Sequence, residues 1–164
     1  MTLVVYAEPS REAYPRHMVV GEESDSREFR YFGYRFDPAS LPTEYRPPAR
    51  WRDYLVANKI PGLIVDESRY VRHLREASGR AYWEKRAESS TSLESYLPPR
   101  DEWDPHAHYS FNPDDFSTEE QPCYNCVTWA TTIANRLIVG FLPVVRQGRI
   151  NLALGYLVQP SRRE

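Results

Sequence analysis

Residues 126–139 constrain the fold most, because they form the clearest helical pattern in the sequence. Small and apolar side chains recur there at spacings of three and four, which places them on one face of a helix. Gly140 and Pro143 end the pattern, and Asn125, just before it, is a good N-cap type. The predicted face consists of Cys126, Ala130, Ile133, Ala134 and Leu137.

Several short segments rich in β-branched and aromatic residues predict strands. The first three are residues 2–7, 17–22 and 27–36, and the spacing of the second and third predicts a hairpin. Residues 150–158 predict a final strand near the C-terminus. We therefore expect an α+β fold in which the Cys126 helix packs on an antiparallel sheet of residues 17–22, 27–36 and the C-terminal strand.

The remaining segments carry weaker signals. The stretch 38–48 contains four prolines and predicts an extended connection. Other predictions are one or two helical turns in 51–57, a turn at 60–62, a helix over 68–88, an irregular loop over 89–104, an acidic loop over 112–121 and a charged end from Pro160 onward.

The bulk properties favour a single domain spanning residues 1–164. A net charge of −2 gives no reason to expect a nucleic-acid partner. No apolar run approaches the roughly 20 residues that a bilayer-spanning helix needs, so no membrane partner is expected. The N-terminal residues show no signal peptide.

Cys126 is the best candidate for a catalytic nucleophile. The thiolate is the reactive form, and a free cysteine has a pKa of about 8.5, so an active one needs stabilisation of the anion. The N-terminus of a helix supplies it through free backbone N–H groups and the helix dipole. The competing interpretation is a buried structural cysteine on the core face of the helix.

A thiol nucleophile also needs a base, and the chain has four histidines. His73 falls on a predicted helix rich in Arg and Glu, where a solvated surface role is expected. His106 and His108 lie beside prolines and acids. His17 opens a predicted core strand just after a loop, and we expect it to be the base.

Three short motifs resemble circularly permuted papain-like proteins, the group that spans NlpC-type permuted peptidases and lecithin:retinol acyltransferase-like enzymes. Residues 17–21 (HMVVG) resemble the strand that begins with the catalytic histidine. Residues 31–38 (YFGYRFDP) resemble the following strand, which often ends in Gly-aromatic-x-Pro, although Pro38 comes later here. Residues 125–130 (NCVTWA) resemble the helix start that carries the nucleophile, and 109–111 the strand-like segment upstream of it.

The resemblance implies a papain-like cysteine hydrolase in which Cys126 attacks an amide or ester and His17 serves as general base and then acid. It implies no cofactor and no metal. Family members usually carry an orienting polar group on the strand after the histidine. Glu28 and Tyr31 are the candidates for it, and neither is assigned.

The resemblance also suggests a substrate order and a setting. We expect a peptide bond in a protein target first, then a peptidoglycan amide, then acyl transfer to or from a lipid. The small size and missing signal peptide resemble toxin domains of bacterial antagonism effectors. Such a domain would be delivered by a secretion system as part of a larger effector. It would act in the cytoplasm of the recipient cell and be neutralised by an immunity protein.

Three alternatives remain open at this point. Cys123 and Cys126 together with His106 and His108 are the right ligand types for a zinc-binding module. The same Cys-x-x-Cys spacing at a helix start also fits a redox site, although the segment before it is acidic rather than a core strand. A non-enzymatic binding module would use aromatic residues as its recognition surface, among them Trp51, Trp83 and Trp103.

Overall fold

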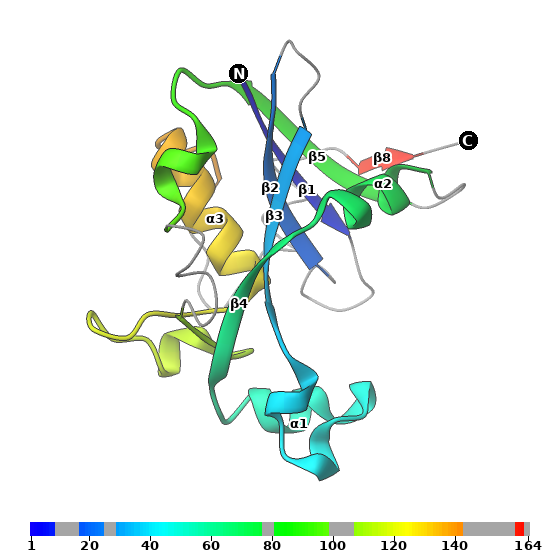
Figure 1. Cartoon of the computed structure of the whole chain (residues 1–164), viewed down its shortest axis with the longest axis vertical. Helices are drawn as coiled ribbons and strands as arrows, with labels where there is room; N and C mark the ends of the chain where they lie inside the picture. The colour runs from blue at the N-terminus through cyan, green and yellow to red at the C-terminus, as the bar shows by residue number, and fades with distance from the viewer. Residues whose placement is uncertain (9–16, 25–28, 77–80, 99–106, 143–159, 163–164) are drawn as a thin grey trace.

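The computed structural model describes residues 1–8, 17–24, 29–76, 81–98, 107–142 and 160–162. In these residues eight strands form one curled, mostly antiparallel sheet with the order β7-β6-β4-β3-β2-β1-β5-β8, and three α-helices accompany it (Figure 1). The strands are β1 (Thr2–Glu8), β2 (His17–Glu23), β3 (Phe29–Phe36), β4 (Ile60–Asp66), β5 (Ala81–Glu88), β6 (Ala107–Tyr109), β7 (Cys123–Tyr124) and β8 (Pro160–Arg162). The helices are α1 (Trp51–Leu55), α2 (Ser68–Glu76) and α3 (Cys126–Leu137). The expected α+β class is confirmed at this level.

The centre of the sheet follows from the first three strands. β1 pairs antiparallel with β2 along its whole length, from Thr2 opposite Glu23 to Glu8 opposite His17. β2 pairs with β3 as the predicted hairpin, but only over Val20–Glu23. The first residues of β2 therefore lie beyond the last β2–β3 pair, and the sheet is open there between the two strands.

Each face of the sheet is covered by one helix (Figure 1). Alternate side chains of β1 point to opposite faces: Leu3, Val5 and Ala7 pack in the larger core with α3, whereas Val4 and Tyr6 pack in a smaller core with Val71 and Leu74 of α2. Burial on both faces explains why β1 lies inside the sheet with a partner on each edge.

Helix α3 begins where the sequence predicts. The Asn125 side chain accepts a hydrogen bond from the Thr128 backbone N–H at 2.8 Å, and the Thr128 hydroxyl accepts one from the Asn125 N–H at 3.0 Å. This reciprocal capping box satisfies two backbone donors at the helix start. The buried face of α3 presents Cys126, Ala130, Ile133 and Ala134 to the core.

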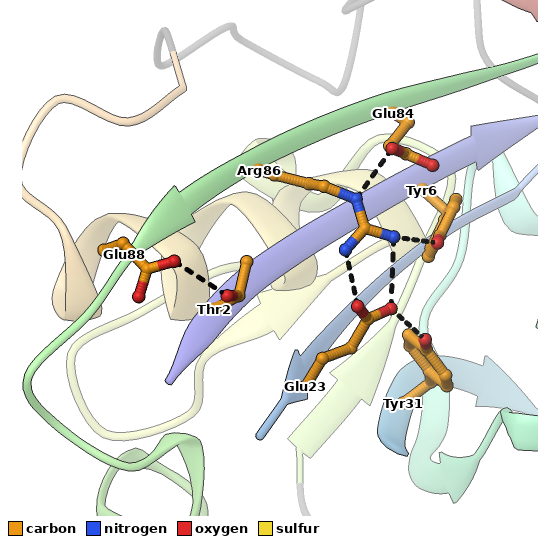
Figure 2. Close-up of polar contacts among 7 residues, drawn as sticks. All are labelled: Thr2, Tyr6, Glu23, Tyr31, Glu84, Arg86 and Glu88. Atoms are coloured by element: carbon orange, nitrogen blue, oxygen red, sulfur yellow. Dashed lines mark hydrogen bonds and ion pairs between the residues drawn. The ribbon is translucent and has the colours of Figure 1, made fainter. Parts of the chain in front are cut away.

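A polar network connects four strands on the α2 side of the sheet (Figure 2). Arg86 of β5 donates to Glu23 of β2 at 2.5 Å, to Glu84 at 2.7 Å and to the Tyr6 hydroxyl at 2.9 Å. The hydroxyl of Tyr31 on β3 donates to the same Glu23 at 2.6 Å. The network therefore fixes the register of strands far apart in the sequence.

The predicted helix over 68–88 is wrong in its second half. The helix ends at Glu76, and Ala81–Glu88 form strand β5, which pairs antiparallel with β1 from Ala7 opposite Trp83 to Thr2 opposite Glu88. Strand β1 is buried on both faces, so the backbone groups on its second edge need a hydrogen-bonding partner. Pairing with β1 therefore outweighs the weak helical periodicity of residues 81–88.

The predicted turn at 60–62 is also wrong, because β4 begins at Ile60. Gly62 faces Phe36, the last residue of β3 that pairs with β4, so Pro61 lies beyond that ladder. The lost N–H of Pro61 therefore breaks no hydrogen bond to β3. Gly62 leaves room for the Tyr34 side chain, whose hydroxyl lies 2.0 Å from the position a Cβ would take.

Two further predictions need correction. The stretch 38–48 is not simply extended: it forms short 3-10 turns at Pro38–Ser40 and Thr43–Tyr45, and another begins at Pro48. The fixed φ of proline suits the first position of such turns.

The expected charged end from Pro160 includes the short strand β8, paired with β5. The predicted strand 150–158 lies outside the described residues. Within the described ranges, no helix is both long and apolar enough to cross a membrane.

Candidate active site

Cys126 is the first residue of α3, at the end of the helix where backbone N–H groups have no acceptor within the helix itself. It lies in the larger core and is 8% exposed. The capping box holds this turn in place, so the sulfur is positioned by both the helix start and the packing around it. The sequence predicts Cys126 at a helix N-terminus, and the structure places it there.

His17 is the first residue of β2 and hydrogen-bonds the Cys126 side chain. Its Nε2 lies 2.8 Å from Glu67 Oε1, which leaves Nδ1 for the thiol. The opening between β2 and β3 gives the sulfur access to this strand. The Met18 backbone N–H, beyond the last β2–β3 pair, hydrogen-bonds Cys126 as well.

Glu67, directly after β4, is the third member of the arrangement. Its carboxylate accepts from Arg35 Nε at 2.6 Å and from Arg35 Nη2 at 3.2 Å, in addition to the contact with His17. Gly33 on β3 makes room for it, since a Cβ there would lie 2.5 Å from Glu67 Oε1. Glu67 thus orients the His17 ring on one side and is itself held by Arg35 on the other.

Two tyrosines pack around the pair. The Tyr70 ring of α2 stands edge-on to His17, with centroids 4.9 Å apart, and its hydroxyl donates to Glu8 at 3.1 Å. Tyr109 at the end of β6 is buried, and its hydroxyl hydrogen-bonds the Cys126 side chain and backbone. Burial and the negative charge of Cys126 raise the pKa of Tyr109, so its hydroxyl stays protonated and is a donor.

The contacts favour a thiolate–imidazolium pair. Burial opposes the charged ring, but the hydrogen bonds to Cys126 and Glu67 outweigh it and raise the pKa of His17 to about 9. Burial also opposes the thiolate, yet the hydrogen bond and charge of His17 hold the pKa of Cys126 below its usual value. For Glu67, the bonds to His17 and Arg35 overcome burial and lower the pKa of its carboxyl. Both shifts favour the charged forms, so the contacts of the site stabilise the thiolate that acts as the nucleophile.

Cys123 differs from Cys126 in its electrostatic surroundings. It is buried on β7, and burial raises the pKa of its thiol to about 11. It lies opposite His108 in the parallel β6–β7 pair, while Cys126 contacts His17 instead. Both cysteines are free thiols. The two members of the Cys-x-x-Cys pair thus have opposite electrostatic surroundings.

Three residues of the zinc alternative, Cys123, Cys126 and His108, are described, and they do not form one group of metal ligands. His106 lies outside the described residues, and Cys126 contacts His17 rather than a second ligand pair. Among the described residues, no three His, Cys, Asp or Glu side chains are grouped so that they could hold a metal ion.

Sequence reasoning did not identify Glu67. Of the two candidates for the orienting group, Glu28 lies outside the described residues, and the hydroxyl of Tyr31 donates to Glu23 rather than to His17. The signal available in the sequence was the pair of acids, Asp66 and Glu67, that directly follows the apolar residues 63–65. Only the pairing of β4 with β3 shows which of the two acids faces His17.

Comparisons of the chain with protein-family models, with curated proteins and with solved structures gave no match.

Proposed function

We propose that the chain is a cysteine hydrolase of papain-like type, with Cys126 as nucleophile, His17 as general base and acid, and Glu67 as the residue that orients His17. One observation carries this proposal. A thiol at a helix N-terminus hydrogen-bonds a histidine whose other ring nitrogen is held by a buried carboxylate. A thiol is activated when a base contacts it and a third group orients that base.

The reaction follows from the positions of these groups. The Cys126 thiolate attacks the carbonyl carbon of an amide or ester, and the His17 imidazolium gives its proton to the leaving group. The product is a thioester on Cys126. His17, now neutral, takes a proton from water as the water attacks the thioester, which releases the acid and restores the thiol pair.

The oxyanion of each tetrahedral intermediate needs donors close to the sulfur. The Tyr109 hydroxyl is a protonated donor that already contacts Cys126. The backbone N–H of Cys126, at the start of α3, lies beside this hydroxyl and donates to it. Both kinds of donor stabilise negative charge that develops beside the nucleophile.

For the substrate we propose a peptide bond in a protein target. A toxin domain acting inside a recipient bacterial cell stays our prediction for the setting. The test uses purified wild type, Cys126→Ala and the matched control Cys123→Ala, each incubated with a bacterial lysate. New protein termini are then identified by mass spectrometry.

We expect the same new termini with wild type and Cys123→Ala and none with Cys126→Ala. Termini that persist with Cys126→Ala would reject Cys126 as the nucleophile. If none of the three proteins produces new termini while wild type hydrolyses peptidoglycan fragments, the catalytic pair is retained and the protein substrate is rejected.

A further inference from the structure

The charged groups of the active site differ sharply in their exposure. The side chains of His17 and Glu67 are 8% and 4% exposed, and Cys126 is similarly buried. Arg35, which ion-pairs with Glu67, has a side chain that is 44% exposed. Arg35 is therefore the most exposed charged group of this cluster.

The Arg35 guanidinium is also fixed in orientation. Its Nε and Nη2 donate to Glu67, and its Cζ lies over the Tyr70 ring, 5.5 Å from the ring centroid. No described residue accepts a hydrogen bond from the remaining nitrogen, Nη1. A guanidinium held in this way presents its free edge with little loss of conformational freedom on binding an anion.

Arg35 is close enough to the reacting groups to affect them. Its charge acts on His17 and Tyr109, and the charge of Cys126 acts on Arg35. The described acidic side chains nearby leave one edge of Arg35 open to an anionic ligand. Glu67 binds His17 and the Nε and Nη2 of Arg35. The Glu8 carboxylate is buried and accepts a hydrogen bond from Tyr70.

From this geometry we infer that Arg35 is a specificity residue that binds a carboxylate or other anionic group of the substrate beside the bond that Cys126 attacks. The inference rests on the proposed function and narrows it. The preferred substrates would carry an acidic side chain or a free carboxylate next to the scissile carbonyl. Guanidinium groups suit this task because their paired N–H donors match a carboxylate.

Two alkylating agents of nearly equal size test the inference without a known substrate. Iodoacetate carries a carboxylate and iodoacetamide is neutral, and with either one the thiolate displaces iodide. The rate of Cys126 labelling is measured with both agents in a Cys123→Ala background. The ratio of the two rates removes any change in the nucleophilicity of Cys126 and reports only the effect of the probe's charge.

We expect Arg35→Gln to lower the iodoacetate-to-iodoacetamide ratio about fivefold, the effect of one partly exposed charge pair. Arg35→Lys should retain most of the ratio. The matched control Arg86→Gln, which removes an arginine from the network on the α2 side of β1 and β5, should leave it unchanged. Equal ratios in wild type, Arg35→Gln and Arg86→Gln would overturn the inference.

A second measurement covers the case in which Arg35→Gln does not fold. Added salt screens charge attraction, so it should slow labelling of the wild-type background by iodoacetate and leave labelling by iodoacetamide unchanged. Equal salt responses would reject the role of Arg35. Slow labelling of Cys126 by both agents, no faster than labelling of Cys123 in wild type, would instead reject the proposed function itself.

Discussion

Replacing Glu67 by Gln tests the electrostatic design of the site most directly. The change keeps the shape of the side chain and removes the charge that His17 and Arg35 share. A hydrogen bond to a charged partner contributes about 1.5–3 kcal/mol. The amide oxygen of Gln can still accept from His17, so the variant loses the charge of the acceptor; at 1.36 kcal/mol per pKa unit, this loss shifts a titration by roughly one to two units. The pKa of His17 is raised to about 9 in the wild type, and in the variant we expect about 7 to 8.

The sign of the second shift follows from the coupling of the pair. The imidazolium is what holds the pKa of Cys126 below its usual value. A less stable imidazolium therefore raises the pKa of Cys126 in Glu67→Gln. The ion pair exists between the lowered pKa of Cys126 and the raised pKa of His17, so this pH window narrows from both ends.

Both ends of the window are measurable in a Cys123→Ala background. The ultraviolet absorbance of the thiolate follows Cys126 with pH, and the ring-proton NMR shifts follow His17. Glu23→Gln is the matched control, because Glu23 also bonds an arginine and a second side chain, Arg86 and Tyr31, on the α2 side of the sheet. It should lower stability without moving either titration. Unchanged titrations in Glu67→Gln would refute the orienting role of Glu67.

Four further substitutions test other parts of the site and of the fold. Gly33→Ala should displace the Glu67 carboxylate, lower the free energy of unfolding by about 1–3 kcal/mol and raise the pKa of Cys126, because the new Cβ would lie 2.5 Å from Glu67 Oε1. Gly140→Ala, where φ is +74° and nothing lies within 4 Å, should lower stability in urea unfolding and leave the thiolate absorbance unchanged. Equal effects of the two on that absorbance would contradict the reasoning. Asn125→Ala should cost about 1 kcal/mol in urea unfolding, since it removes the cap that Thr128 shares, and no loss would show that the cap is replaced. Tyr109→Phe should raise the pKa of Cys126 and, with an active substrate, lower kcat about 10²-fold or more, whereas an unchanged kcat would exclude the hydroxyl as an oxyanion donor.

The parts of the site that could be predicted are those set by local sequence. The start of α3 at Cys126 follows from the cap at Asn125 and the helical spacing after it, and the start of β2 at His17 follows from the strand pattern. Glu67 could not be placed, because its position depends on the register of β4 against β3, in which Phe32 pairs with Asp66. That register arises from packing across the sheet, and the sequence around Glu67 contains no local pattern that predicts it.

The same distinction explains the errors in the fold. The apolar periodicity that predicts a helix beyond Glu76 is a local signal. Residues 81–88 form a strand because they pair with the edge of β1, which is distant in the sequence. Likewise, Pro61 and Gly62 have the composition of a turn, but their place in β4 is decided by what lies beside them: the end of the β3 ladder and the Tyr34 side chain.

The opening between β2 and β3, which lets Cys126 contact the first residues of β2, has a consequence for the order in which the site forms. His17, Glu67, Tyr109 and Cys126 are spread over more than a hundred residues, and the nucleophile is the last of them in the chain. During synthesis the β1–β2–β3 hairpins and β4 can pair before α3 has left the ribosome. The reactive pair therefore cannot form until Cys126 has been made, after the strands that position its base and the orienting carboxylate.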